Sequence, residues 1–398
     1  MSNKLIYEFS SHKTDGDASL NNLLGGKGAN LAEMSKLGIE VPPGFTITTE
    51  ACNYFSKNKH LPEGLKEEIT SSVSLLESYS EKRFGAGGSP LLLSVRSGGT
   101  ISMPGMMDSI LNIGVNDENV NDLAEAFDDE RFALDSYRRL IQMYSNVVLG
   151  VEHERFEAVI ANKKRMDDVV SDADFNIDQL HWIINAYKNT VERFTNSPFP
   201  QDPYEQLIGA IEAVFLSWQN KRAITYRKIN NIPDSLGTGA TVQTMVFGNL
   251  NDKSGTGVAF TRNPSSGIKE LYGEYLINAQ GEDVVAGIRT PHPISNEDSP
   301  GEESLESKFP TAYKEINQIA NKLEQHFKEV QDIEFTIENE KVYLLQTRKA
   351  KRTAQASVKI AIDMNGEGIT TKEESLTMVD ANNITNLLHP QFVENQEK

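Results

Sequence analysis

Residues 332–348, DIEFTIENEKVYLLQTR, predict a β-hairpin in the strand-rich part of this chain. In the first half, apolar Ile333, Phe335 and Ile337 alternate with polar residues, which is typical of a β-strand with one buried face. A second β-type run follows at 342–347. Residues 339–341, Asn-Glu-Lys, separate the two runs and predict a hairpin with a three-residue loop.

The loop length sets the register, and the register decides which side chains share a face. A three-residue loop gives three cross-strand pairs: Glu334 with Gln346, Asp332 with Arg348, and Phe335 with Leu345. A two-residue loop would instead place Glu334 opposite Leu345 and scatter the polar groups. We therefore prefer the first register, in which one face is apolar and the other gathers two carboxylates, an amide and a guanidinium.

The polar face of this hairpin has the composition of a magnesium and phosphate site. Mg²⁺ is usually held by one or two carboxylates together with phosphate oxygens and water. Arg348 would contact a phosphate beside the metal. Val342 and Leu344 are expected on the same face, as a cleft wall against a flat base. The alternative interpretation is an exposed polar sheet face without a ligand. The candidate metal and nucleotide ligands are Asp332, Glu334 and Gln346.

Gly25-Gly26-Lys27-Gly28 predicts a glycine-rich turn that leads into a helix. The spacing does not match the Walker A motif, but free amides at a helix start favour an anion and Lys27 lies beside them. The alternative is an ordinary helix entry with a surface lysine.

Two further glycine-rich segments follow. Arg96 lies where a β-type run gives way to a loop rich in Gly and Ser, and its planar guanidinium suits phosphate oxygens. Gly255-Thr256-Gly257 is expected to form a loop between two antiparallel strands, with amides and the Thr256 hydroxyl over a nucleotide's phosphates. The alternative there is a plain hairpin turn.

The remaining sequence predicts a mixed fold. Residues 117–195 are expected to be helical, and 195–203 resemble a boundary that ends in a helix start, with Asp202 as N-cap and Pro203 in the first turn. Short β-type runs dominate from about 240, and the tail after about 350 is expected to bury little. Helices and strands are mixed with strands clustered late, so the class is α+β or α/β with several subdomains.

Composition excludes several functions. The 398 residues contain 39 Lys and Arg against 57 Asp and Glu, a net charge of −18, which disfavours non-specific binding to nucleic acid or to an anionic membrane. No run of about 18 apolar residues predicts a membrane span. The single cysteine, Cys52, and the absence of a signal-peptide pattern favour a cytoplasmic location.

Six stretches together resemble the pyruvate, phosphate dikinase family, over nearly the whole chain. SMPGMMD favours this family over the related pyruvate, water dikinases. The stretches are GGKGANLAEM (25–34), SMPGMMD (102–108), VQTMVFGN (242–249), GTGVAFTRNP (255–264), NAQGEDVVAGIRTP (278–291) and DIEFTI with LLQTR (332–348).

The resemblance implies an α+β, ATP-grasp-type nucleotide-binding domain with two lobes and a helical insertion. The family converts ATP, phosphate and pyruvate to AMP, pyrophosphate and phosphoenolpyruvate through a phosphohistidine. By resemblance, Lys27 and Arg96 bind ATP phosphates, Asp332, Glu334 and Gln346 surround Mg²⁺ and nucleotide, and Arg348 and Arg139 contact the phosphates being cleaved, beneath a Gly255–Gly257 loop. The expected segments are an N-terminal lobe (1–116), a helical insertion (117–200), the remaining fold (201–348) and a linker (349–398).

Two departures from the family open a second hypothesis. The loop after Arg96 reads SGGTIS where the family usually has SGARAS, so a positive charge is missing at Thr100. The family's phosphohistidine segment and pyruvate-binding barrel are absent from these residues, so the acceptor histidine is expected in trans, on a separate domain or subunit. A homodimer is an option for a full-length enzyme. The alternative function is a catalytically idle nucleotide-binding sensor or regulatory subunit.

Overall fold

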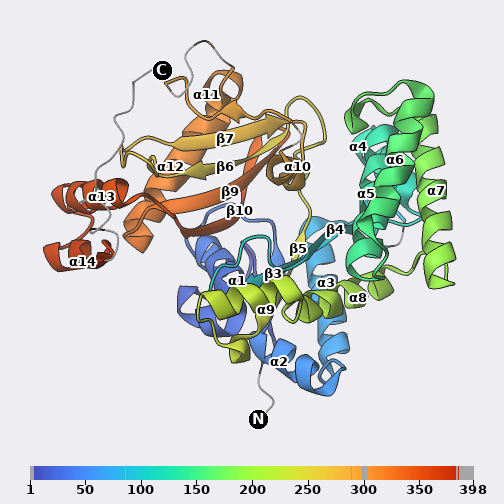
Figure 1. The fold of residues 1–398 in the computed structure, drawn as a ribbon, viewed down its shortest axis with the longest axis horizontal. Helices are drawn as coiled ribbons and strands as arrows, with labels where there is room; N and C mark the ends of the chain where they lie inside the picture. Colours follow the sequence, from blue (N-terminus) through green and yellow to red (C-terminus); the bar gives the residue numbers. More distant parts are fainter. Residues whose placement is uncertain are drawn as a thin grey trace. The chain divides into compact units, whose positions relative to one another are not determined.

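The computed structural model describes residues 4–381 and 384, apart from residues 86, 288, 298–300 and 302 (Figure 1). The chain divides into two compact units, Met1–Val246 and Phe247–Lys398. Each unit contains one five-stranded antiparallel sheet with helices packed on it, which confirms the predicted α+β class.

The sheet of the first unit has the order β1-β2-β5-β3-β4. β2 and β5 are buried at every position because helices cover both faces. Neighbouring residues of a strand point to opposite faces, and the Cβ positions of Gly98 and Gly99 point toward Lys27 of α1 and Trp218 at the end of α8. The strands are β1 (Ile6–Phe9), β2 (Gly44–Ile47), β3 (Leu93–Gly99), β4 (Ser109–Ile113) and β5 (Thr238–Thr244).

Helices of the first unit fall into two groups. One group packs around the sheet, and the other stands beside β4 as a helical block held by α5 (Figure 1). The predicted helix start at 202 is confirmed, since the Asp202 side chain accepts from the Glu205 amide at 2.8 Å. The first group comprises α1 (Asn21–Lys36), α2 (Thr49–Asn58), α3 (Leu65–Ser80), α8 (Pro203–Ser217) and α9 (Lys221–Ile229), and the block comprises α4 (Val120–Phe127), α5 (Glu130–Val147), α6 (His153–Asp167) and α7 (Ile177–Thr195). Three short 3-10 turns span Ala18–Leu20, Asp172–Asp174 and Asp234–Leu236.

The sheet of the second unit has the order β10-β9-β6-β7-β8. Helix α12 covers one face, where Tyr275 packs edge-on against Phe309 at the start of that helix. The elements are β6 (Gly255–Phe260), β7 (Tyr272–Ile277), α10 (Gly281–Ala286), β8 (His292–Pro293), α11 (Leu305–Lys308), α12 (Pro310–Phe327), β9 (Gln331–Glu338) and β10 (Lys341–Lys349).

The segment after residue 350 packs onto the second unit, so the expectation that it buries little is wrong. Helix α13 (Ala354–Gly366) and Met378, which directly follows α14 (Lys372–Thr377), contribute to an apolar cluster with Val330 and Ala350. The cluster side chains on α13 follow helical spacing, a pattern that short length and small residues made easy to miss. They are Ala356, Ile360, Ala361 and Met364.

Candidate functional site

The β9–β10 hairpin confirms the predicted polar pairs but reaches them by a different route. Asn339 and Glu340 have φ values of +48° and +66°, as a two-residue type I′ turn requires. The predicted three-residue loop is therefore wrong. A β-bulge at Leu345 then shifts the register by one residue, so that Glu334 faces Gln346 and Asp332 faces Arg348.

The bulge also explains why three apolar placements are wrong. Between the turn and the bulge, Leu344 pairs with Phe335 and Val342 pairs with Ile337, so Phe335 does not face Leu345. Val342 and Leu344 therefore lie on the apolar face, fully buried, and do not form a wall of the polar face. A one-residue shift exchanges the two faces of a strand, and the sequence gives no direct sign of the bulge.

The side chains of the polar face bind one another. Gln346 Nε2 donates to Glu334 Oε1 at 2.7 Å, and Arg348 Nε donates to Asp332 Oδ2 at 2.8 Å. The Asp332 side chain is 11% exposed and that of Arg348 is 35% exposed, so the guanidinium stays within reach of solvent. Burial raises the pKa of Asp332 above its ordinary value, and the positive charge of Arg348 opposes that shift without cancelling it.

Strand β6 extends this face, and the loop expected at Gly255-Thr256-Gly257 is wrong. These residues form a central strand between β9 and β7. The Thr256 hydroxyl is buried and donates to the Phe335 carbonyl oxygen at 3.1 Å. A Cβ atom at residue 257 would lie 2.6 Å from Phe335 Cζ, so close packing accounts for that glycine. In the ladder, Val258 and Phe260 of β6 face Glu334 and Asp332 of β9.

The donor set of the polar face fits a magnesium ion bound together with phosphate. Glu334 and Gln346 approach within 2.7 Å, so both side chains point to one place where a cation could be shared. Asp332 fits less well because Arg348 already holds its carboxylate. Within the described residues, no group of three or more His, Cys, Asp and Glu side chains could hold a metal ion. Phosphate and water oxygens would therefore have to complete the shell.

In the first unit, the glycine-rich turn of α1 lies against the end of β3. Gly25 has φ +69° and ψ 162°, which interrupts the helix, and a Cβ there would lie 1.7 Å from the Gly98 carbonyl oxygen. The Cβ position of Gly98 is 3.1 Å from Lys27 Cβ. Arg96 lies two residues before Gly98 and thus shares its face of the sheet. Lys27 and Arg96, distant in sequence, therefore lie on one face of one sheet.

Gly99 and Thr100, where the sequence differs from the usual family pattern, lie beside the glycine-rich turn of α1. The Asn21 side-chain amide donates to the Thr100 carbonyl oxygen at 3.3 Å, and the Cβ position of Gly26 is 3.5 Å from the Gly99 carbonyl oxygen. A change in this loop therefore acts next to Lys27.

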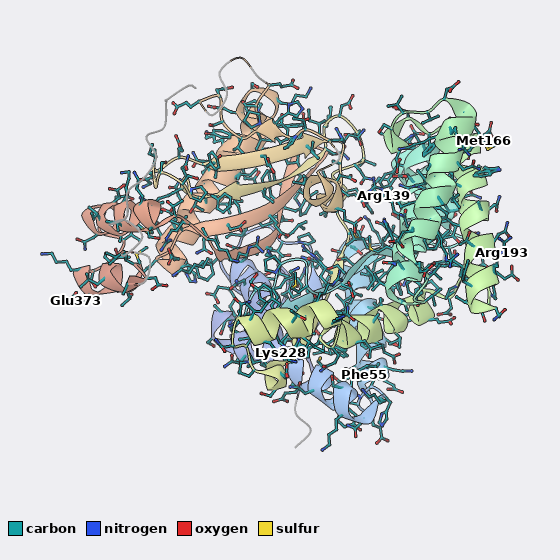
Figure 2. All side chains as sticks on the ribbon, viewed as in Figure 1. Phe55, Arg139, Met166, Arg193, Lys228 and Glu373 are labelled. Carbon is teal, nitrogen blue, oxygen red and sulfur yellow. The ribbon has the colours of Figure 1, made fainter. Side chains whose placement is uncertain are left out.

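Arg139 lies in the helical block, on α5 (Figure 2). The Asp135 carboxylate accepts from Arg139 Nε at 2.9 Å and from Arg138 Nε at 2.8 Å. The two guanidinium groups hold the pKa of Asp135 well below its ordinary value, although burial acts in the opposite direction. Arg139 is thus fixed by a buried ion-pair cluster, which sequence reasoning missed because Asp135 lies in an ordinary helical stripe.

Sequence reasoning also missed the residues that anchor the SMPGMMD segment. Asp108, its last residue, accepts from the Asn220 side chain at 2.9 Å and pairs with Arg222. Arg222 Nε also donates to the Met106 carbonyl oxygen at 3.1 Å. Both partners lie more than a hundred residues away in sequence, so no local pattern signals the contact.

Comparison with known proteins shows which family this chain belongs to. The family model "Pyruvate phosphate dikinase, AMP/ATP-binding domain" matches residues 21–82, 57–311 and 294–368. The chain is 52% identical to pyruvate, phosphate dikinase from Rhizobium meliloti (strain 1021) over 97% of its length and 44% of that relative. Identity to the Clostridium symbiosum protein is 50%, over 98% of this chain and 43% of the relative. Identity to the chloroplastic Arabidopsis thaliana protein is 48%, over 98% and 40%.

Fold and sequence together define a nucleotide-binding domain of the ATP-grasp type. The chain belongs to the pyruvate phosphate dikinase AMP/ATP-binding domain family. It spans less than half the length of these curated relatives. Among the described residues, no helix is long and apolar enough to cross a membrane.

Proposed function

We propose that this chain is the ATP-binding, phosphoryl-donating part of a pyruvate, phosphate dikinase. It would bind Mg·ATP and transfer the βγ-phosphates to a histidine on a separate domain. The observation that carries this proposal is the polar face of the β9–β10 hairpin, where Glu334 meets Gln346 and Asp332 meets Arg348, in a chain of this family. The single cysteine supports a cytoplasmic location as part of the same proposal.

In the proposed site, cationic side chains neutralise the polyphosphate. Phosphoryl transfer depends mainly on positioning and on charge stabilisation. Lys27 and Arg96 would bind the phosphates from the first unit, and Arg348 would contact the phosphates being cleaved. Arg139 is assigned the same task, held in place by Asp135.

Glu334 and Gln346 would hold Mg²⁺, with Asp332 beside them. Magnesium bound to phosphate oxygens neutralises charge there. Asp332 has a second task, since its bond to Arg348 Nε fixes the direction of the guanidinium. Strand β6 lies beside β9 in this face, where Val258 pairs with Glu334 and Phe260 pairs with Asp332.

The transfer itself needs an acceptor nitrogen. A histidine nitrogen would attack the β-phosphorus, the bond from that phosphorus to the α–β bridging oxygen would break, and AMP would leave. Inorganic phosphate would then take the γ-phosphoryl group as pyrophosphate, and the β-phosphoryl group would stay on histidine for pyruvate. The seven histidines of this chain lie in sequence contexts without a glycine-rich or hydroxyl-rich setting, so the acceptor is assigned to another domain.

Labelled ATP tests this proposal. The chain would be mixed with a dikinase phosphohistidine domain and with ATP carrying a labelled β-phosphate. We expect AMP formation and label on the added domain, with near-background cleavage by the chain alone. Rapid ADP release by the isolated chain would contradict the proposal. Mg·ATP binding without AMP formation, even with the added domain, would favour the idle sensor.

A further inference from the structure

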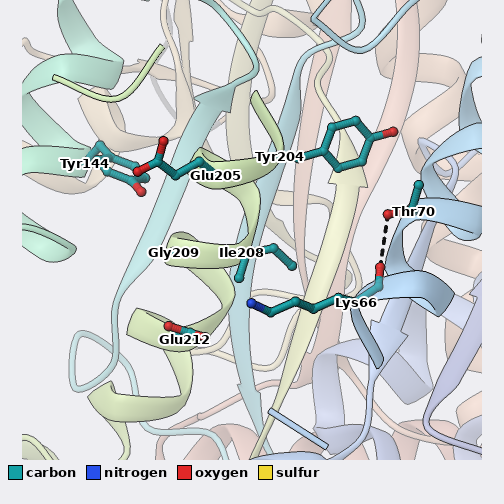
Figure 3. Close-up of a pocket in the computed structure, with 8 residues that line it drawn as sticks. All are labelled: Lys66, Thr70, Tyr144, Tyr204, Glu205, Ile208, Gly209 and Glu212. Carbon is teal, nitrogen blue, oxygen red and sulfur yellow. Dashed lines mark hydrogen bonds between the residues drawn. The ribbon is translucent and has the colours of Figure 1, made fainter. Parts of the chain in front are cut away.

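A cavity lies within the first unit, between α3, α5 and α8 (Figure 3). Its volume is about 530 Å³, within the range of small-molecule sites. None of the residues proposed for nucleotide or metal lines it. Its polar side chains are Lys66 and Thr70 of α3, Tyr144 of α5, and Tyr204, Glu205 and Glu212 of α8.

The Tyr144 hydroxyl is the most unusual group of this cavity. Tyr144 is only 2% exposed, and its ring packs edge-on against Phe199. In the part of the chain that the structure describes, its hydroxyl has no hydrogen-bond partner, yet it lines the cavity. The hydroxyl oxygen faces the open cavity, so its hydrogen bonds go to water or to a ligand held there. A ligand in the cavity would satisfy this hydroxyl.

Gly209 makes room for the hydroxyl. A Cβ atom at residue 209 would lie 2.3 Å from the Tyr144 hydroxyl oxygen, so any other residue would block it. Glycine is unfavourable inside a helix such as α8. The close approach of Tyr144 therefore gives this glycine a physical reason.

Three charged side chains line the same cavity, of which Lys66 and Glu205 are exposed and Glu212 is partly buried. Glu205 and Glu212 are seven residues apart on α8, which places them on one face about 10 Å apart along the axis. Lys66 lies across the cavity on α3 (Figure 3). Among the described residues, none of these three side chains forms an ion pair or hydrogen bond. The helix dipole accounts for an acidic residue in the first turn, at Glu205, but not for Glu212.

The surroundings keep the hydroxyl protonated. Burial is the largest cause that raises the pKa of the Tyr144 hydroxyl, and the negative charges of Glu205 and Glu212 raise that pKa further. The hydroxyl can thus both donate to and accept from a ligand.

We propose that this cavity binds a small dibasic zwitterion, an aliphatic molecule with two cationic groups and one carboxylate. The cavity offers two unpaired carboxylates and one unpaired ammonium group, and that ligand class has the complementary charges. Its cationic groups would pair with Glu205 and Glu212 and its carboxylate with Lys66. The aliphatic part would lie over Ile208 and Gly209, within reach of the Tyr144 hydroxyl.

Calorimetry of the full chain with three probes tests the ligand class. L-lysine has all three charges, cadaverine lacks the carboxylate, and L-norleucine lacks the side-chain ammonium group. We expect saturable binding of L-lysine and about tenfold weaker binding of each other probe, because each loses a charge-assisted contact. The absence of saturable heat with L-lysine at concentrations up to about 10 mM, roughly ten times a millimolar dissociation constant, would overturn the proposal. Equal binding of cadaverine would also overturn it.

Variants test the location. Glu212→Gln should weaken L-lysine binding about tenfold, and Tyr144→Phe, which keeps the ring packing, should weaken it severalfold. Glu68→Gln, an exposed change on α3 outside the cavity, is the matched control and should have no effect. Mg·ATP affinity should be the same in all four proteins. If Glu68→Gln weakens L-lysine binding as much as Glu212→Gln does, L-lysine is attracted only by the net negative charge of the protein. The assigned site would then be wrong.

Discussion

The two glycine-rich segments expected to approach phosphate, 25–28 and 255–257, have opposite structures. The first interrupts a helix, because Gly25 adopts a conformation restricted to glycine and approaches the Gly98 backbone. The second is a central strand in which Gly257 leaves space for Phe335. Glycine enrichment alone therefore does not distinguish a ligand-facing turn from a crowded sheet. The backbone angles of the glycine and the kind of atom next to it distinguish the two cases.

The largest effect is expected for Gly25→Ala. The new Cβ would meet a backbone oxygen, which cannot move aside, at an unfavourable φ, so we expect a loss of more than about 4 kcal/mol in unfolding free energy. Gly38→Ala is the matched control, since Gly38 has φ +68° with no heavy atom near its Cβ position. It should cost only about 1–2 kcal/mol. Urea unfolding measures both, and equal losses would mean that the contact with Gly98 is unimportant.

The next effect concerns the lysine that the first segment positions. Lys27→Met and Arg96→Leu should each weaken ATP binding by about 1.5–3 kcal/mol, tenfold or more, because each removes a charge-assisted contact to phosphate. Adenosine has no phosphate, so its affinity should stay unchanged. Calorimetry with both ligands separates the cases. A parallel loss for adenosine would indicate damage to the fold.

A smaller effect is expected for Gly257→Ala. Its Cβ would lie 2.6 Å from the end of the Phe335 ring, which can shift, and 2.7 Å from the Glu274 carbonyl oxygen, a longer approach than the 1.7 Å at Gly25, so overpacking should cost about 1–3 kcal/mol. Phe335→Leu should be destabilising alone but should relieve part of this cost in the double variant. Urea unfolding of the four proteins gives the coupling energy. Strict additivity would show that the Glu274 carbonyl oxygen, and not packing against Phe335, is the reason for the glycine.

The same contrast shows what the sequence could predict. Alternation within 332–337 correctly predicted that Asp332 and Glu334 share the polar face, because residue spacing within a strand is fixed by geometry. The alternation could not predict the bulge at Leu345. The polar pairs agree with the prediction because a two-residue turn and one extra residue at the bulge give the same pairs as a three-residue loop. Contacts between distant residues, such as Gly25 with Gly98 or Asp108 with Asn220, leave no local periodic signal.

The central claim is that the polar face of β9 and β10 binds Mg·ATP, and calorimetry with and without Mg²⁺ tests it most directly. In the wild type, removing Mg²⁺ with a chelator should weaken ATP binding strongly. Glu334→Gln should weaken Mg·ATP binding about tenfold and should lose most of the Mg²⁺ dependence. Glu373→Ala, an exposed change on α14, should match the wild type. If Glu334→Gln binds Mg·ATP with wild-type affinity and wild-type Mg²⁺ dependence, the nucleotide and its metal do not bind at this face.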